Sequence, residues 1–152
     1  MKVIVQRCSE ASVKVDDKII SKINKGYLLL VGFGKNDDVS DIKKVVRKII
    51  NLRIFEDENG KINLSLDDVK GEILSVSQFT LYASLNGRRP SFSLALDYKN
   101  ANELYDIFNN ELRKNSVSVK TGKFGADMKV NIVNDGPVTI IIDSKENIWK
   151  KD

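Results

Sequence analysis

The sequence predicts a single α+β domain in which two principal helices pack on a strongly curved, barrel-like β-sheet. Its 152 residues, of which 41% are hydrophobic and 30% charged, suit one soluble domain with a sizeable core. Short apolar or alternating stretches recur along most of the chain, whereas only two segments have the spacing of an amphipathic helix. We find no internal repeat, linker or low-complexity tract in the sequence, so a second domain is not expected.

The N-terminal third predicts strands followed by a helix. Residues 2–6 are apolar enough for a strand, and residues 11–23 alternate apolar and polar side chains about a polar turn, which is typical of a hairpin. Residues 27–33 are continuously apolar, as in a central strand covered on both faces. Residues 39–50 repeat apolar side chains at helical spacing, and Asp38 or Ser40 can cap that helix.

The middle of the chain predicts two further strands and the second helix. Residues 52–55 and 72–81 have strand character, and a polar turn at residues 56–61 follows the first of them. Residues 83–93 contain Gly and Pro and are interpreted as a loop. Residues 98–114 carry one apolar face and predict a helix.

The C-terminal third returns to strands. Residues 117–120 and 128–133 are expected to continue the sheet, and residues 138–142 form one more apolar run. Residues 134–139 are therefore interpreted as the turn between the last two strands. The domain is expected to cover residues 1–145, and residues 146–152, which include Ile148 and Trp149, to form a polar tail.

The rare residue types exclude several kinds of enzyme. The sequence contains no histidine, which removes the usual general base, the Ser-His and Cys-His dyads and the commonest zinc ligand. Its single cysteine, Cys8, excludes an internal disulfide and is expected to be a small core residue. No metal or cofactor is expected. The N-terminus lacks a signal peptide and no apolar run reaches the length of a membrane span, which favours a cytoplasmic protein.

The first unusual stretch is Asn-Asp-Gly-Pro-Val-Thr at residues 134–139. Asn and Gly accept the positive φ of a tight turn, whereas the proline lacks an amide hydrogen and fixes φ. X-Pro is also the peptide bond at which the cis form is accessible. The stretch is either a stiff turn without chemistry or a rigid presentation of two neighbouring carbonyl oxygens at Gly136 and Pro137.

The second unusual stretch is Ser77-Gln78-Phe79-Thr80, near the end of a predicted strand. In a strand, Ser77 and Phe79 would face one way and the other two residues the opposite way. These polar groups either satisfy neighbouring backbone or form a pocket whose amides and hydroxyls bind a carbonyl that becomes an oxyanion.

Together, the two stretches resemble the paired signature of the D-aminoacyl-tRNA deacylases, formerly described as D-tyrosyl-tRNA deacylases. The resemblance covers nearly the whole chain. Further matching segments are Val5-Gln6-Arg7, Ala11-Ser12-Val13, Arg53-Ile54-Phe55, Gly60-Lys61-Ile62-Asn63, Arg89-Pro90-Ser91-Phe92, Thr121-Gly122-Lys123-Phe124 and Ala126-Asp127-Met128.

The resemblance implies a homodimer with active sites at the subunit interface, acting on the ester that joins a D-amino acid, or glycine, to the 3′ end of tRNA. It implies that the Gly136-Pro137 bond is cis and reaches into the partner's pocket. There its carbonyl oxygens would hold the substrate amino group and leave no room for an L side chain. It also implies that the 2′-hydroxyl of the terminal adenosine helps to activate water, while the protein positions the ester.

The same resemblance assigns the site residues. The catalytic pocket is expected to contain Ser77, Gln78, Phe79 and Thr80. Thr80 is not expected to be a nucleophile, because no residue near it in sequence is an obvious base. Substrate binding and rejection of L-amino acids are assigned to Gly136, Pro137, Asn134, Thr139, Arg7 and Met128. Contacts to tRNA phosphate, with ordinary solvated loops as the equal alternative, are assigned to Arg88, Arg89, Lys120 and Lys123.

Several alternatives stay open at this point. Arg7 either anchors the motif, contacts the adenosine or is an exposed arginine at a strand end. Phe92 and Phe124 are interpreted as core residues rather than base-stacking platforms. A sister deacylase that removes an L-amino acid would be favoured by a trans Gly136-Pro137 bond. A non-catalytic tRNA-binding dimer is consistent with the net charge of +4. Neither DNA nor a membrane is expected as a partner.

Overall fold

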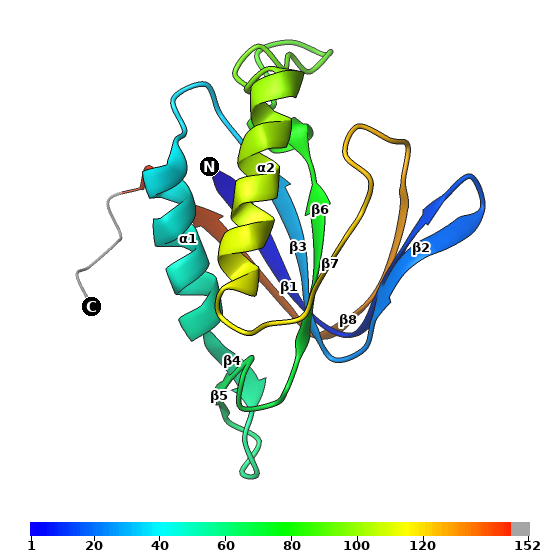
Figure 1. Cartoon of the computed structure of the whole chain (residues 1–152), viewed down its shortest axis with the longest axis vertical. Coiled ribbons are helices and arrows are strands. Elements are labelled where there is room, and N and C mark those ends of the chain that lie inside the picture. The colour runs from blue at the N-terminus through cyan, green and yellow to red at the C-terminus, as the bar shows by residue number, and fades with distance from the viewer. Residues whose placement is uncertain (147–152) are drawn as a thin grey trace.

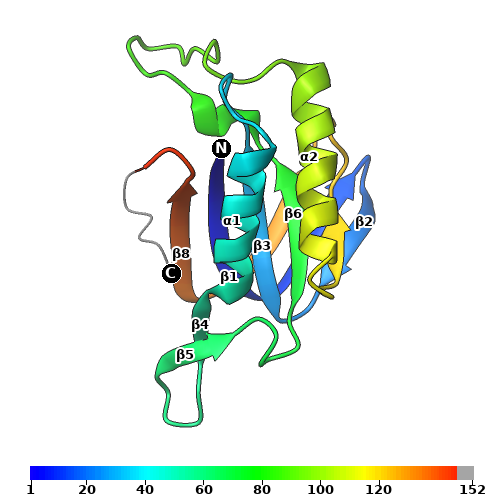
Figure 2. The same cartoon turned by 60° about the vertical axis from the view of Figure 1, so that its left-hand side comes forward.

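Both helices lie on one face of a six-stranded mixed sheet in the computed structural model, which describes residues 1–146 (Figure 1, Figure 2). The sheet order is β2-β1-β3-β6-β7, and β8 pairs with β1. The strands of this sheet are β1 (Lys2–Val15), β2 (Lys18–Ile23), β3 (Gly26–Gly32), β6 (Glu72–Ser77), β7 (Val119–Thr121) and β8 (Lys129–Asp143). The remaining elements are α1 (Val39–Asn51), the hairpin of β4 (Arg53–Glu56) and β5 (Ile62–Ser65), the 3₁₀ turn η1 (Phe79–Tyr82) and α2 (Tyr98–Arg113).

The long strand β1 gives the sheet its curvature. Its first half pairs with β3 and its second half with β2, while β8 runs antiparallel to both halves along the other edge. β3 and β6 are parallel, as are β6 and β7. The result is a nearly closed, barrel-like sheet, which confirms the predicted fold class (Figure 1).

The two predicted helices are confirmed, and each begins at an aspartate cap. The Asp38 carboxylate accepts hydrogen bonds from the amides of Ser40 and Asp41, and Asp41 returns the contact to the Asp38 amide. This capping box satisfies the first amides of α1. At the start of α2, the Asp97 carboxylate accepts a hydrogen bond from the amide of Asn100. Neither helix, nor any other within residues 1–146, is long and apolar enough to cross a membrane.

The core has two parts, one on each face of the sheet. The larger part lies between the sheet and the two helices, and its central contact is the stacked pair of Tyr27 and Phe55, with ring centroids 5.2 Å apart. The smaller part lies inside the curve of the sheet and contains Cys8, which is fully buried. Burial raises the pKa of the Cys8 thiol to about 11, so the thiol stays protonated and the core prediction is confirmed.

Two predictions for the strands were incomplete. Residues 2–6 and the first arm of the 11–23 hairpin are one strand, β1, because β8 pairs with it across the polar residues in between. β5 was not predicted at all. It is a four-residue edge strand whose apolar side chains are partly exposed, so its sequence carries little periodic signal. Residues 147–152 of the predicted tail at 146–152 lie outside the described residues.

Candidate active site

Residues 134–139 form a bulge within β8 and are not a turn. Asn134 pairs with Cys8 and Thr139 with Gln6, so residues 135–138 all lie opposite the single residue Arg7. β8 therefore continues in the same direction after the motif. The predicted turn is wrong because the two apolar runs pair with successive parts of β1 and not with each other.

The side chain of Arg7 lies under the bulge and holds it. It is 3% exposed, so the alternative of an exposed surface arginine is wrong. Its Nε donates to the Asp135 carbonyl (3.1 Å), and its Nη1 donates to the Ile54 carbonyl (2.8 Å). The carboxylates of Asp135 and Glu56 lie 3.5 and 3.7 Å from the guanidinium. Because its donors face the protein, Arg7 is placed to anchor the motif.

The side chain of Asn134 closes the base of the bulge. Its Nδ2 donates to the carbonyl oxygens of Arg7 (3.0 Å) and Val138 (3.1 Å). Its Oδ1 accepts a hydrogen bond from the Thr139 hydroxyl (3.3 Å), which in turn accepts one from Gln6 (3.3 Å). Asn134 and Thr139, which the resemblance assigns to substrate binding, thus support the bulge from within.

At the tip of the bulge, Gly136 and Pro137 are exposed and joined by a cis peptide bond, as the resemblance implied. Gly136 has a φ of +119°, which favours glycine. A Cβ atom at this position would lie 2.8 Å from Arg7 Nη2 and 2.9 Å from Val138 Cγ2. A side chain at position 136 would therefore need a strained backbone and a shift of Arg7 or Val138.

A separate cleft of about 620 Å³ opens at the carboxyl ends of the parallel strands β3 and β6. Its walls are mainly apolar with a few polar groups, as in a small-molecule site. Four segments supply these walls: residues 31–33, 76–79, 92–98 and 124–130. Ser77, Gln78, Phe79 and Met128 all line it. Of the described residues, those of the bulge are not part of its walls.

Strand β6 ends at Ser77, and the chain then turns into η1, so the predicted strand over residues 72–81 is four residues too long. The alternation of side chains expected for residues 77–80 is therefore wrong. The physical reason lies in β3, where a Cβ at Gly32 would lie 2.8 Å from the Gln78 carbonyl oxygen and 3.1 Å from Leu81 Cβ. The chain bends over this glycine, and the Gln78 amide donates to the Val31 carbonyl (2.7 Å).

The geometry of η1 separates the roles of its residues. The first amides of a helical turn have no partner inside the turn, so those of Phe79 and Thr80 are left to bind other groups. Thr80 does not line the cleft, and its hydroxyl oxygen accepts a hydrogen bond from the Gln78 side-chain amide (2.6 Å). An amide N–H is not a base, so this contact does not activate the hydroxyl.

Two aromatic pairs flank the cleft. Phe79 and Phe92 meet edge to face with ring centroids 5.0 Å apart, and Tyr98 and Phe124 do the same at 5.0 Å. Phe124 also packs against the core, as predicted, whereas Phe92 is 36% exposed at the cleft, so its core prediction is wrong. Tyr98 was missed, because its sequence signal is only that of the first residue of a helix.

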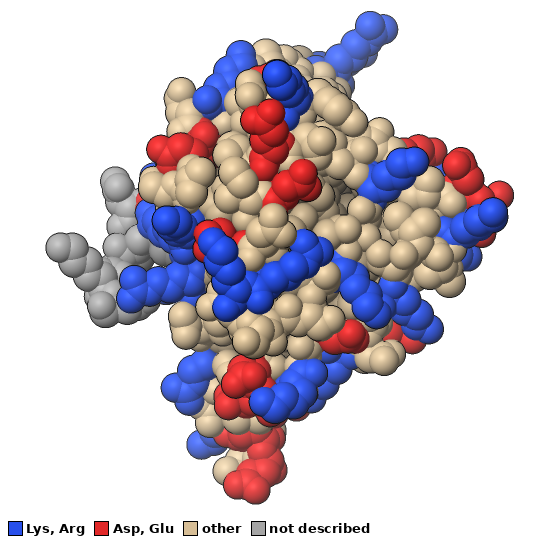
Figure 3. All heavy atoms as spheres, viewed as in Figure 1, with Lys and Arg blue, Asp and Glu red and all other residues tan. Residues whose placement is uncertain are grey.

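The four basic residues considered for tRNA phosphate have different surroundings. Arg88 and Arg89 are exposed in the loop before Phe92, and Lys123 is exposed after β7. Lys120 instead donates to the Lys22 carbonyl (2.8 Å) and lies 3.8 Å from the Glu72 carboxylate. On the face shown in Figure 3, basic side chains are interspersed with acidic ones, so charge alone does not mark a nucleic-acid path.

Comparison with known proteins agrees with this arrangement. Residues 4–143 match the family model described as D-Tyr-tRNA(Tyr) deacylase. The chain is 53% identical over 148 residues to the D-aminoacyl-tRNA deacylase of Clostridium perfringens, covering 97% of this chain and 99% of that protein. It is 55% identical over 148 residues to the one from Thermosipho melanesiensis, covering 96% and 99%.

A solved structure, that of the c-Myc DNA unwinding element binding protein, matches with a TM-score of 0.91 and 46% identity. The match covers 96% of this chain and 100% of that one. Sequence and fold therefore agree over nearly the full length of both molecules. The chain belongs to the D-aminoacyl-tRNA deacylase family of hydrolases.

Proposed function

We propose that each active site combines the cleft of one subunit with the bulge of a second copy, and that this site hydrolyses D-aminoacyl-tRNA and glycyl-tRNA. The observation that carries the proposal is the separation, within one chain, of the bulge at residues 134–139 from the cleft that residues 77–79 line. The bulge presents Gly136 and Pro137 outward, while the cleft contains Ser77, Gln78 and Phe79. The bulge of a second copy can therefore reach the cleft that the bulge of the same chain does not line.

The face of the sheet that carries no helix supports association of two copies. Ile141 pairs with Ile4, and Ile4 with Leu30, so these side chains form one row across β8, β1 and β3 on the face without helices. Ile141 is 69% exposed, and its two neighbours are half-buried. An exposed apolar row of this kind is typical of a surface that is covered by a partner.

The chemistry proposed for the cleft is stabilisation of an oxyanion. The free amides of η1 would donate to the ester carbonyl oxygen as it becomes negatively charged in the tetrahedral intermediate. The aromatic pairs flanking the cleft would hold the terminal adenosine of the tRNA. Water is the nucleophile in this scheme, and the 2′-hydroxyl of the adenosine assists it, because the chain contains no histidine to act as the base.

Selection against L-amino acids is assigned to the bulge. The carbonyl oxygens of Gly136 and Pro137 would accept hydrogen bonds from the substrate ammonium group. The hydrogen bond from Arg7 to the Asp135 carbonyl would keep the tip from moving aside for an L side chain. Glycine has no side chain and would be accepted. The cis form of the Gly136-Pro137 bond supports this reading over a sister enzyme that acts on L-amino acids.

Deacylation time courses on matched D-Tyr-tRNA, L-Tyr-tRNA and Gly-tRNA test the activity without added metal. We expect rapid loss of the D and glycyl esters only. Preferential loss of the L ester would support the sister deacylase, and no cleavage of any ester would leave the tRNA-binding dimer as the function.

Subunit mixing tests the shared site. Gly136→Ala disrupts the bulge, and Ala126→Trp fills the cleft, so each variant alone should be inactive. An equimolar mixture of the two should regain about a quarter of wild-type activity, because half of its dimers are mixed and each mixed dimer holds one intact site of two. No recovery in dimers shown to exchange subunits would contradict a shared site.

A further inference from the structure

The 3₁₀ turn η1, whose amides are proposed to bind the oxyanion, makes few packing contacts of its own. It has no buried residue, and its preceding residue, Gln78, makes no side-chain capping contact. Phe79, at its start, is 56% exposed. At the two ends of the turn, the Leu81 amide donates to the Gln78 carbonyl (3.3 Å) and the Ala83 amide donates to the Thr80 carbonyl (3.1 Å). A four-residue turn of this kind needs a further anchor to keep its amides in a fixed direction.

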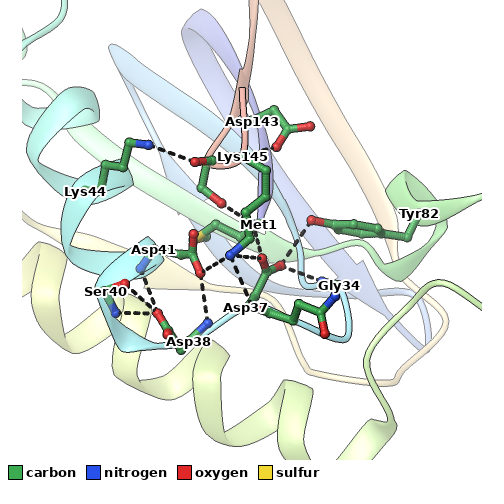
Figure 4. A network of polar contacts seen from close by, with 12 residues as sticks. Met1, Gly34, Asp37, Asp38, Ser40, Asp41, Lys44, Tyr82, Asp143 and Lys145 are labelled. Atoms are coloured by element: carbon green, nitrogen blue, oxygen red, sulfur yellow. Dashed lines mark hydrogen bonds and ion pairs between the residues drawn. The ribbon is translucent and has the colours of Figure 1, made fainter. Parts of the chain in front are cut away.

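That anchor is the last residue of the turn. The Tyr82 hydroxyl donates to the Asp37 carboxylate (3.1 Å), which lies in the loop between β3 and α1 (Figure 4). The ring lies directly against Gly34, where a Cβ would approach it to 2.6 Å. The Lys2 ammonium lies 4.8 Å from the centre of the same ring. Asp37 therefore holds the hydroxyl of Tyr82, while Gly34 and Lys2 contact its ring.

Asp37 is itself fixed by groups from other elements. Its carboxylate accepts a hydrogen bond from the Gly34 amide (2.6 Å) and pairs with the Met1 ammonium group (2.6 Å) and, at 3.7 Å, with Lys145. The side chain is 3% exposed. An acceptor with this many donors has little freedom to move, so it gives the Tyr82 hydroxyl a stationary partner.

The phenol of Tyr82 keeps its proton in this place. Burial and the nearby Asp37 carboxylate both raise the pKa of Tyr82 above its ordinary value. The hydroxyl thus remains a hydrogen-bond donor to the carboxylate throughout the neutral pH range.

We propose that Tyr82 and Asp37 are positioning residues for deacylation, which hold η1 so that the amides of Phe79 and Thr80 point at the ester. The inference rests on the proposed function, because it assumes that these amides bind the oxyanion. Neither residue lines the cleft, so both act through η1 and leave the binding walls unchanged. Their loss should therefore lower kcat while KM stays the same, because the amides act on charge that develops in the transition state.

The test compares four variants, namely Tyr82→Phe, Asp37→Asn, their combination and Asp41→Asn, under single-turnover and steady-state conditions. Tyr82→Phe removes only the hydroxyl and should lower kcat about tenfold with KM within about twofold of wild type. Asp37→Asn also weakens the ion pairs with Met1 and Lys145, so its combination with Tyr82→Phe is compared with Asp37→Asn alone. The double variant should lower kcat no further than Asp37→Asn, because both changes break the contact between Tyr82 and Asp37. Asp41→Asn is the control, since Asp41 belongs to the same polar cluster and pairs with Lys145 (2.8 Å) without contacting η1.

Asp41→Asn should lower the Tm and leave kcat unchanged. Wild-type kcat in Tyr82→Phe, or an equal loss of kcat in Asp41→Asn, would overturn the assignment. Amide hydrogen exchange at Leu81 and Ala83 supplies a measurement that is independent of catalysis. Faster exchange in Tyr82→Phe is expected, and unchanged exchange would overturn the inference. If the wild type cleaved no ester, the proposed function would fail, and hydrogen exchange would still decide whether Tyr82 holds the turn.

Discussion

The bulge and the cleft achieve rigidity in different ways. The bulge is supported from beneath by Arg7, which donates to the Asp135 carbonyl, and by its own Asn134, which donates to the carbonyl oxygens of Arg7 and Val138. The cleft is assembled from four separate segments, and η1 rests on a glycine and on one tyrosine contact. The bulge is therefore suited to excluding a side chain by shape. The cleft is suited to presenting backbone donors whose direction depends on its neighbours.

This difference predicts that the cleft is more sensitive to a single added methyl group. Gly32→Ala would place a Cβ 2.8 Å from the Gln78 carbonyl oxygen, which is backbone and so moves only with η1 itself. Loss of the aligned amides should lower kcat by about 100-fold to 1,000-fold. Steady-state kinetics on D-Tyr-tRNA measure the kcat of this variant. Gly87→Ala, in a loop where the new Cβ meets open space, is the matched control and should keep wild-type kcat.

The corresponding change in the bulge is Gly136→Ala. The new Cβ collides with Arg7 and Val138, and the φ of +119° is unfavourable for alanine. Displacement of the tip by an ångström should lower kcat/KM on the D ester by about 100-fold. Gly60→Ala also has a positive φ but open space around it, and it should lose stability only. Equal activity of the Gly136 and Gly60 variants would contradict a functional tip.

The support beneath the bulge should be less sensitive than the tip. Arg7→Lys keeps the charge but loses the fork that reaches the carbonyl oxygens of Ile54 and Asp135 together. We expect a loss of about 2–4 kcal/mol in the free energy of unfolding, because a buried charge loses its partners, and about a tenfold lower kcat/KM. Urea denaturation and kinetics measure the two effects. Arg47→Lys, at an exposed arginine of α1, should change neither.

The smallest effect on the deacylation rate is expected from the loss of the Thr80 hydroxyl in η1. Thr80→Ala removes the acceptor of the Gln78 side chain but no group that lines the cleft. The rate of D-Tyr-tRNA deacylation should remain within about threefold of wild type, because the hydroxyl has no base to activate it. Single-turnover time courses measure this rate. A loss of several orders of magnitude would make Thr80 a nucleophile and contradict the use of water.

Local patterns were sufficient for the parts of the fold that are set within a few residues. The helices at 39–50 and 98–114 were predicted almost to their ends, because an apolar period of 3.6 and an aspartate cap are local signals. The limits of β6 and the course of residues 134–139 were not, because both depend on a partner strand far away in sequence. Gly32 bends the chain after β6, and Arg7 bonds to a residue 128 positions later.

The sequence by itself determined the family, the fold class and the two motifs, since these depend on residue type and order. Only the tertiary structure decided where the motifs lie: one at the carboxyl ends of parallel strands, the other on an exposed bulge of β8. It alone revealed the contact between Tyr82 and Asp37, two residues that no pattern connects. The physical reason is that strand register and buried polar contacts follow from long-range packing, which local periodicity does not encode.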